Sequence, residues 1–237
     1  MISALMKYDY GTLKDCLDSI EVSMLKILKN SKFSDTEELD VSNHLFFDHI
    51  LRVGEIAIDR NDEASVSLIL NSLSTIGLKA ANLNYSFFSG QSVRAIGQIG
   101  EKAAAKNDKS ILRESRNYLN CVGERFIDKE LKYPIDMVFL YNRTITETAL
   151  KENIDNARYQ DGLTESEIKF NYNILLEALL FIDNIGYKLR QNNKNKIYDL
   201  TVELSCIQHL NKKFNQNNER FDWIERMIEE SLQKYSN

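Results

Sequence analysis

Residues 53–62 read VGEIAIDRND and residues 99–108 read IGEKAAAKND, so one pattern recurs after 46 positions. The similarity runs without a gap from residues 47–79 to residues 93–125 and includes the glycine pair Gly77 and Gly123. A period of this length is typical of proteins that stack pairs of helices. The sequence therefore predicts an all-α fold, an α-α superhelix (solenoid) of about four to five helix pairs.

The composition favours helix and excludes several classes of partner. The 237 residues include one proline and nine glycines, so the two residues that break helices are scarce. The net charge of −5 and the pI near 5.4 supply no basic surface for a phosphate backbone or an anionic membrane. We expect a protein or peptide partner, no nucleic acid, and no membrane insertion, because no apolar run approaches the length of a span.

The whole chain, 1–237, is expected to form a single helical-repeat domain. Its units are a partial unit at about 1–30, then 38–81, 90–129, 138–190 with an insertion near 156–172, and a cap at 195–237. The paired helices are expected near 38–60 and 63–81, 90–106 and 108–129, and 195–213 and 218–235. Because the first unit keeps only a short first helix, two interpretations stay open: an irregular N-terminal cap, or an excised piece of a longer protein.

Short polar motifs mark where the helices begin and end. Asp62 is expected to cap the helix that follows it, and the recurring asparagines are expected at helix ends and turns: Asn61, Asn107 and Asn153. Two pairs have the spacing of a capping box, in which each residue bonds the other's backbone N–H: Ser34 with Glu37, and Thr164 with Glu167.

The spacing of the glycines locates the inserted segment. Gly186 lies in the same local pattern as Gly123 but follows it by 63 residues, so about 17 residues are inserted. Pro134 predicts a break, with Tyr133 in a connector, because the residue before a proline is disfavoured in a helix. Gly77 and Gly123 are expected at close contacts between helices, because glycine inside a helix otherwise costs about 1 kcal/mol.

The first helices of the two clear units, at residues 52–57 and 92–104, resemble those of HEAT repeats. The resemblance to HEAT- and armadillo-like superhelices covers residues 4–190 and implies a non-catalytic scaffold for protein–protein interaction. Similar domains also occur behind the transmembrane helices of uncharacterised prokaryotic membrane proteins. The resemblance therefore implies a cytoplasmic location, either as a free protein or as a regulatory domain of a membrane-anchored parent.

No group of residues in the sequence has the spacing of a catalytic, cofactor or metal site. The three cysteines are far apart, and His44 and His49 are five residues apart, which places them on different helix faces. We therefore predict no enzyme activity, no catalytic residue, no cofactor and no metal. An enzyme or a nucleic-acid binder on a helical-repeat frame is a less favoured alternative.

The second helices of the units usually line the inner surface of such superhelices, which predicts the partner-binding face. Five polar residues on these helices are the predicted partner contacts: Asn71, Arg113, Arg116, Asn117 and Asn120. An aromatic cluster in the expected connector between the two clear units is the alternative contact: Tyr85, Phe87 and Phe88. Packing at the seam between units would also explain these aromatic residues.

Overall fold

A computed structural model of the protein describes residues 1, 9–30, 40–158, 164–191, 200–214 and 219–235. Over these residues the chain forms nine α-helices and no strand, which confirms the predicted all-α class. The helices are α2 (Tyr10–Asn30), α3 (Asp40–Asp59), α4 (Glu63–Asn82), α5 (Ser86–Ala105), α6 (Lys109–Asp128), α7 (Lys132–Arg158), α8 (Glu165–Gln191), α9 (Leu200–Phe214) and α10 (Glu219–Tyr235).

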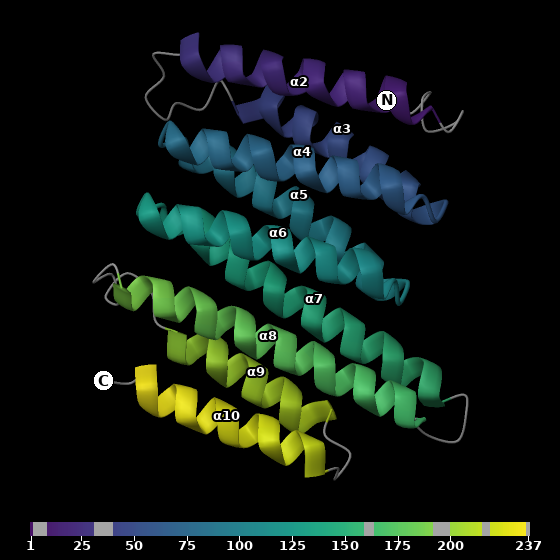
Figure 1. Ribbon diagram of the computed structural model, residues 1–237, viewed down its shortest axis with the longest axis vertical. Helices are drawn as coiled ribbons and strands as arrows, with labels where there is room; N and C mark the ends of the chain where they lie inside the picture. Colours follow the sequence, from purple (N-terminus) through teal and green to yellow (C-terminus); the bar gives the residue numbers. More distant parts are fainter. Residues whose placement is uncertain (2–8, 31–39, 159–163, 192–199, 215–218, 236–237) are drawn as a thin grey trace.

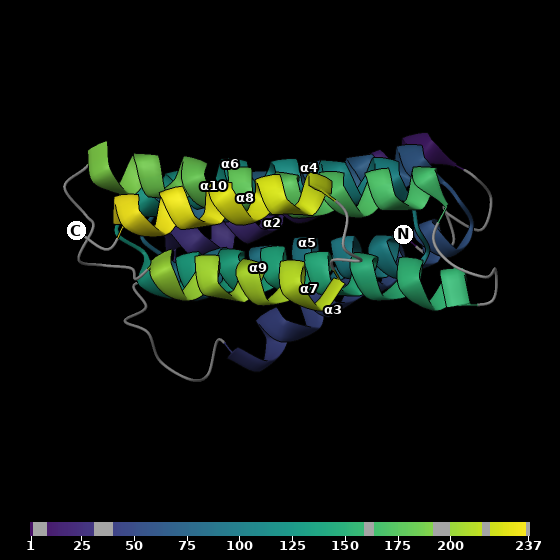
Figure 2. The same cartoon turned by 90° about the horizontal axis from the view of Figure 1, so that it is seen from below.

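The helices from α3 onward lie in two layers, as the end-on view in Figure 2 shows. One layer, called the even layer below, contains α4, α6, α8 and α10, and the other, the odd layer, contains α3, α5, α7 and α9. From α3 onward, each helix packs on the next helix in the chain and on the next but one. The first described helix, α2, packs on α4 (Figure 1). Successive helices therefore alternate between the layers along the long axis of the molecule.

Four turns of the same geometry connect α3 to α7. Each contains one residue with positive φ: Asn61 at 55°, Asn84 at 62°, Asn107 at 55° and Glu130 at 57°. The residue after each one donates its N–H to a carbonyl five positions earlier, as Asp62 does to Ala57 at 3.0 Å. This is the hydrogen-bond pattern of a Schellman C-cap. The turns recur every 23 residues, so the structural period is half the sequence period of 46.

The N-terminal caps explain why the sequence shows only the longer period. Asp62 and Asp108 each accept a hydrogen bond at 3.1 Å from a backbone N–H in the next helix, which confirms the predicted cap at Asp62. Tyr85, which precedes α5, makes no side-chain cap. The even-layer helices α4 and α6 thus begin at an aspartate and α5 does not, so the cap residues match after two helices rather than after one.

Glycines allow the helices of both layers to approach closely. A Cβ atom at Gly54 would lie 2.9 Å from Ile99, and one at Gly100 would lie 2.6 Å from Ile145, which is the same contact one repeat later. A Cβ at Gly77 would lie 2.7 Å from the Ser92 hydroxyl, and one at Gly123 would lie 3.1 Å from Ile185. These distances confirm the close contacts predicted for Gly77 and Gly123.

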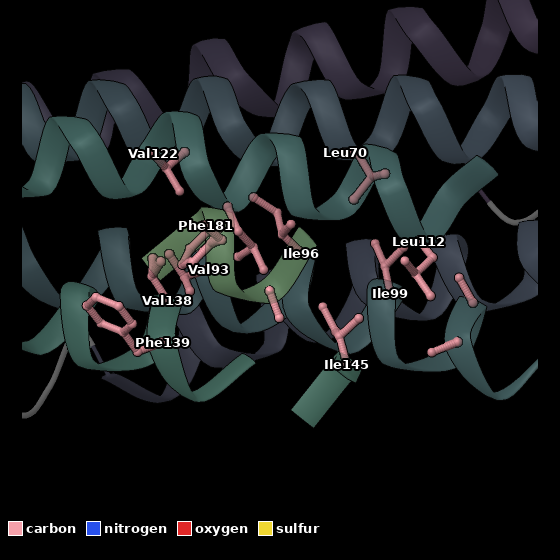
Figure 3. Close-up of a cluster of buried hydrophobic side chains, with 14 of the residues drawn as sticks. Leu70, Val93, Ile96, Ile99, Leu112, Val122, Val138, Phe139, Ile145 and Phe181 are labelled. Carbon is pink, nitrogen blue, oxygen red and sulfur yellow. The ribbon is translucent and has the colours of Figure 1, made fainter. Parts of the chain in front are cut away.

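A continuous apolar core fills the space between the layers. Figure 3 shows Leu70 and Val122 from the even layer and Ile96 and Ile145 from the odd layer meeting there. All four side chains are fully buried. Because burial of an aliphatic side chain contributes about 1.5–3 kcal/mol, this shared core is the main force that holds the two layers together.

The prediction of a connector around Pro134 is wrong. Lys132 is the first residue of α7, so Tyr133 and Pro134 lie inside its first turn. A proline is tolerated there because the first N–H groups of a helix have no partner within the helix. The break that the proline marks is the turn at Glu130, a few residues earlier.

The insertion lengthens two helices rather than forming a separate element. α7 and α8 each contain 27 residues, seven more than each helix from α3 to α6. Asn153, expected at a turn, lies instead inside α7, where its amide donates to the Asn171 side chain at 2.7 Å. The capping box at the start of α8 is confirmed, because Thr164 N–H donates to Glu167 at 2.7 Å and Glu167 N–H donates to Thr164 at 3.3 Å.

The capping box predicted for Ser34 and Glu37 lies outside the described residues.

Contrary to the expectation about apolar runs, α4 is long and apolar enough to cross a membrane by length and composition alone. However, 61% of that apolar window is buried inside the molecule, as in the central helix of any packed helical domain.

Candidate functional site

Four of the five predicted partner contacts come together between α6 and α8. Arg113, Arg116, Asn117 and Asn120 line a hollow of about 210 Å³ on the even layer. Its other lining residues come from α8: Glu177, Leu180, Phe181 and Asn184. The fifth predicted contact, Asn71, is exposed on α4 and does not line the hollow. We call this hollow with its eight lining residues the α6–α8 site.

Repeated polar contacts set the register of the even-layer helices. Ser67 of α4 donates to Glu114 of α6 at 2.6 Å, and Arg113 of α6 donates to Glu177 of α8 at 3.4 Å. Ser67 and Arg113 occupy the same position of the repeat, and Glu114 and Glu177 share the next position. The α6–α8 site is therefore built on a contact that also occurs between α4 and α6.

A second pair of contacts repeats at the other end of the same helices. Arg125 of α6 donates to the Asn82 side chain of α4 at 2.8 Å, and Lys188 of α8 lies 3.6 Å from Asp128 of α6. Asn82 corresponds to Asp128, and Arg125 corresponds to Lys188, in the register of Gly77, Gly123 and Gly186. α4, α6 and α8 are thus stacked in one repeating register.

Arg116 joins three helices from a buried position. Only 4% of the residue is exposed. Its guanidinium donates to Thr146 of α7 at 2.5 Å, and to the Ile174 carbonyl and the Glu177 carboxylate of α8, both at 3.2 Å. Burial lowers the pKa of Arg116 to about 10, although Glu177 opposes this shift, so the side chain stays charged at neutral pH. Arg116 is therefore a positioning residue with little surface open to a partner.

Arg116 occupies a position that the repeat otherwise gives to leucine. The equivalent residues are Leu70 in α4 and Leu179 in α8, and both are buried in the core. The same holds for Asn142 of α7, which is 1% exposed and is equivalent to Ile96 of α5. Replacing core aliphatic residues by buried polar groups costs desolvation energy, which hydrogen bonds and ion pairs only partly offset.

The polar cluster around Arg116 is not fully hydrogen-bonded. Three of its buried side-chain atoms have no hydrogen-bond partner in the structure: Arg116 Nε, Asn120 Oδ1 and Asn142 Oδ1. Buried polar atoms are paired in most proteins, because an unpaired one costs roughly 1–3 kcal/mol. The junction of α6, α7 and α8 therefore carries polar groups that packing alone does not require.

The rim of the α6–α8 site is open to solvent. The Arg113 side chain is 68% exposed, and Asn117, Leu180 and Asn184 are also exposed. Glu177 contacts Arg113 through one carboxylate oxygen and Arg116 through the other. This arrangement places a surface arginine beside three amide side chains, those of Asn117, Asn120 and Asn184, which both donate and accept hydrogen bonds.

The alternative contact, the aromatic cluster, lies at a helix start rather than in a connector. Tyr85 is the N-cap of α5, and Phe87 and Phe88 lie in its first turn. Phe88 is buried, and its ring centroid lies 5.9 Å from that of Phe87 and 6.5 Å from that of Phe47 on α3. Tyr85 and Phe87 are half-buried against the core. The three rings pack at the seam between units, and their use by a partner stays a prediction.

A second, larger hollow lies between α7 and α9, and the sequence reasoning missed it. Its volume is about 580 Å³, and Arg143, Cys206 and His209 are among its lining residues. Arg143 donates to the Cys206 sulfur at 3.2 Å. Glu147, on the wall of this hollow, follows Glu55 and Glu101 at intervals of 46 residues, and this repeated glutamate is the sequence signal that could have pointed to this part of α7.

Among the residues that the structure describes, no group of three or more His, Cys, Asp or Glu side chains could hold a metal ion. No protein-family model, curated protein or solved structure shows significant similarity to the chain. Any functional assignment therefore depends on the geometry of the molecule itself.

Proposed function

We propose that the chain is a HEAT- or armadillo-like α-α superhelix that acts as a non-catalytic scaffold for protein–protein interaction. The repeating turns every 23 residues, the alternation of helices between two layers and the common register of α4, α6 and α8 support the superhelical part. Stacked helical repeats present extended surfaces that suit peptides and protein segments.

The functional part of the proposal depends on one observation. Beneath the α6–α8 site, Arg116 and Asn142 occupy buried positions at which the equivalent residues of other helices are leucine or isoleucine. A purely structural stack would keep Leu at position 116, as it does at Leu70 and Leu179. Replacing a buried ion pair by apolar residues of similar volume is often neutral or stabilising, so packing alone does not call for an arginine at this position. Here the buried Arg116 fixes Glu177 and, through it, the exposed Arg113 on the even layer.

A peptide selection tests this proposal. The immobilised protein is challenged with a display library of random 12-residue peptides, and the selected sequences are remade and measured by fluorescence anisotropy. We expect binding to weaken in the double variant Asn71→Ala/Asn117→Ala, which removes two exposed amides at equivalent positions of α4 and α6. Binding should persist in the control variant Arg52→Gln on the odd layer, whose side chain is also exposed.

The outcomes separate the two faces of the molecule. Loss of binding in Arg52→Gln, with full binding in the double variant, would place the partner surface on the odd layer and contradict the proposal. Failure to select any peptide that binds the folded protein would contradict the proposed scaffold role itself. Thermal unfolding of each variant, which should match the parent within a few degrees, confirms that the fold is intact.

A further inference from the structure

We propose that the α6–α8 site takes an acidic side chain of the partner, an aspartate or glutamate with an apolar residue beside it. This inference rests on the proposed scaffold function and names the chemistry that the partner must present. The site is lined by two guanidinium groups and one carboxylate, Arg113, Arg116 and Glu177, so its lining carries one positive charge in excess. The chain as a whole has a net charge of −5, so this local balance is opposite in sign to that of the molecule.

Arg113 is the group that would meet the carboxylate. It makes one 3.4 Å contact with Glu177, and its side chain is 68% exposed. A guanidinium has five N–H donors in a planar fork, so donors remain directed to solvent after that contact. The fork matches the two oxygens of a carboxylate, and such bidentate pairs are stronger than neutral hydrogen bonds.

The amides and the apolar wall define the rest of the ligand. Asn117, Asn120 and Asn184 line the hollow and supply both donors and acceptors, which suits the backbone of a peptide segment. Leu180, at 46% exposure, and the buried Phe181 form an apolar wall on the α8 side. The volume of about 210 Å³ is below the usual range of small-molecule pockets, so the site admits one or two side chains rather than a whole ligand.

Contacts made by the buried Arg116 position the exposed Arg113 for the ligand. Arg116 holds Glu177 through one carboxylate oxygen and is itself held by Thr146 and the Ile174 carbonyl. The other oxygen of Glu177 contacts Arg113. Arg116 thus acts on the ligand through Glu177, and the ordering of Arg113 before binding lowers the entropy lost on binding.

Nuclear magnetic resonance with defined probes tests the inference. The probe is N-acetyl-glutamyl-leucinamide, and the matched control is N-acetyl-glutaminyl-leucinamide, which differs only in the charged oxygen. Each is titrated into the isotope-labelled protein, with inorganic phosphate as a third arm. We expect saturable shifts of the side-chain signals of Arg113, Asn117, Asn120 and Asn184 with the glutamyl probe, and affinity about tenfold lower for the glutaminyl control.

Two exposed arginines give a matched pair of variants. Arg113→Gln should lower the affinity for the glutamyl probe about tenfold. Arg52→Gln should leave it unchanged, since the Arg52 side chain is 69% exposed and lies on the odd layer. Equal shifts with both dipeptides, equal loss in both variants, or a response to phosphate alone would each overturn the inference.

The failure of this inference differs from the failure of the proposed scaffold function. If display-selected peptides lose binding in Asn71→Ala/Asn117→Ala but carry no excess of acidic residues and bind Arg113→Gln normally, the even layer is the partner surface and the acidic preference is wrong. If no peptide engages the even layer while the glutamyl probe still fills the hollow, the site binds small carboxylates and the scaffold function is wrong.

Discussion

At the residue scale, Arg116 combines a buried charge with a role at the surface. Its equivalents Leu70 and Leu179 show which residue the packing prefers. The repeat aligns Arg116 with Leu70, so its burial could have been predicted from the sequence. We expect it from sequence to contact a partner, because it is polar where a purely structural helix could carry alanine or leucine. The structure shows that Arg113 is exposed and Arg116 is not.

Charge reversal at Arg116 should therefore destabilise the fold instead of only removing a partner contact. Arg116→Glu would place a second carboxylate beside Glu177 in the interior and should lower the free energy of unfolding by roughly 3–5 kcal/mol. The double variant Arg116→Leu/Glu177→Leu should be neutral or more stable, because it restores leucine at position 116 and removes both members of the buried ion pair together. Urea denaturation measures both, and equal loss in the two variants would show that the ion pair itself is stabilising.

Asp59 at the end of α3 links stability to acid pH. Hydrogen bonds from Lys102 of α5 and from Lys106, which caps the C-terminus of α5, lower its pKa from 3.8 to about 2. A carboxyl with a lowered pKa stabilises the folded state above its unfolded pKa, near 3.8, and this contribution is lost as the pH falls toward 2. Asp59→Asn should flatten the pH dependence of the melting temperature in that window. An unchanged profile between the parent and the variant would contradict the assignment.

At the element scale, each helix from α3 to α6 is followed by a turn that contains one residue with positive φ. Asparagine tolerates this conformation, whereas an ordinary side chain costs about 1–2 kcal/mol. Glu130 is the one member of the four turns that is not asparagine. Glu130→Gly should therefore raise the free energy of unfolding by about 1 kcal/mol, more than Asn61→Gly does. The reverse order in denaturation would show that the glutamate side chain stabilises its turn.

The glycine seams give the second test at this scale. Gly77→Leu and Gly123→Leu should each lower the free energy of unfolding by roughly 1–3 kcal/mol, because a larger side chain overpacks the contacts with Ser92 and Ile185. Gly11 in the first turn of α2 is exposed and has room for a Cβ, 3.6 Å from Asp9, so Gly11→Ala serves as the control and should not destabilise. Parental stability in both leucine variants would contradict the close packing.

The sequence predicted the regular elements well and the irregular ones poorly, for physical reasons. The helices at 63–81 and 108–129 agree closely with α4 and α6, because Asp62 and Asp108 mark their starts. The start of α5 at Ser86 was placed four residues too late, because Tyr85 caps it without a side-chain bond. Asn153 lies inside the lengthened α7 and contacts Asn171, a residue 18 positions away, and no local pattern reveals that contact.

The candidate site was predictable in its location but not in its composition. Arg113, Asn117 and Asn120 share one face of a helix, so a periodic pattern brings them together. Glu177, Leu180 and Asn184 come from α8, after the insertion. Their position opposite α6 depends on how the insertion is divided between α7 and α8, and the spacing of glycines alone does not determine that division.

At the scale of the whole molecule, the charge distribution argues against nucleic acid as a partner. The net charge is −5, and many basic side chains are used in contacts between helices, as Lys102 and Lys106 are with Asp59. We expect no sub-micromolar binding to a duplex or a single strand at moderate salt. Electrophoretic mobility shifts over a range of salt concentrations check this, and tight binding that weakens steeply with salt would contradict it.

Hydrogen exchange of the protein with and without a display-selected peptide shows which layer binds the partner, because it reports every helix in one experiment. We expect the peptide to slow amide exchange in α4, α6 and α8, with the largest effect beside Arg113, Asn117 and Asn184, while α3, α5 and α7 exchange as before. Protection confined to the odd layer, or to the start of α5 around Phe87, would contradict the claim that the even layer binds the partner.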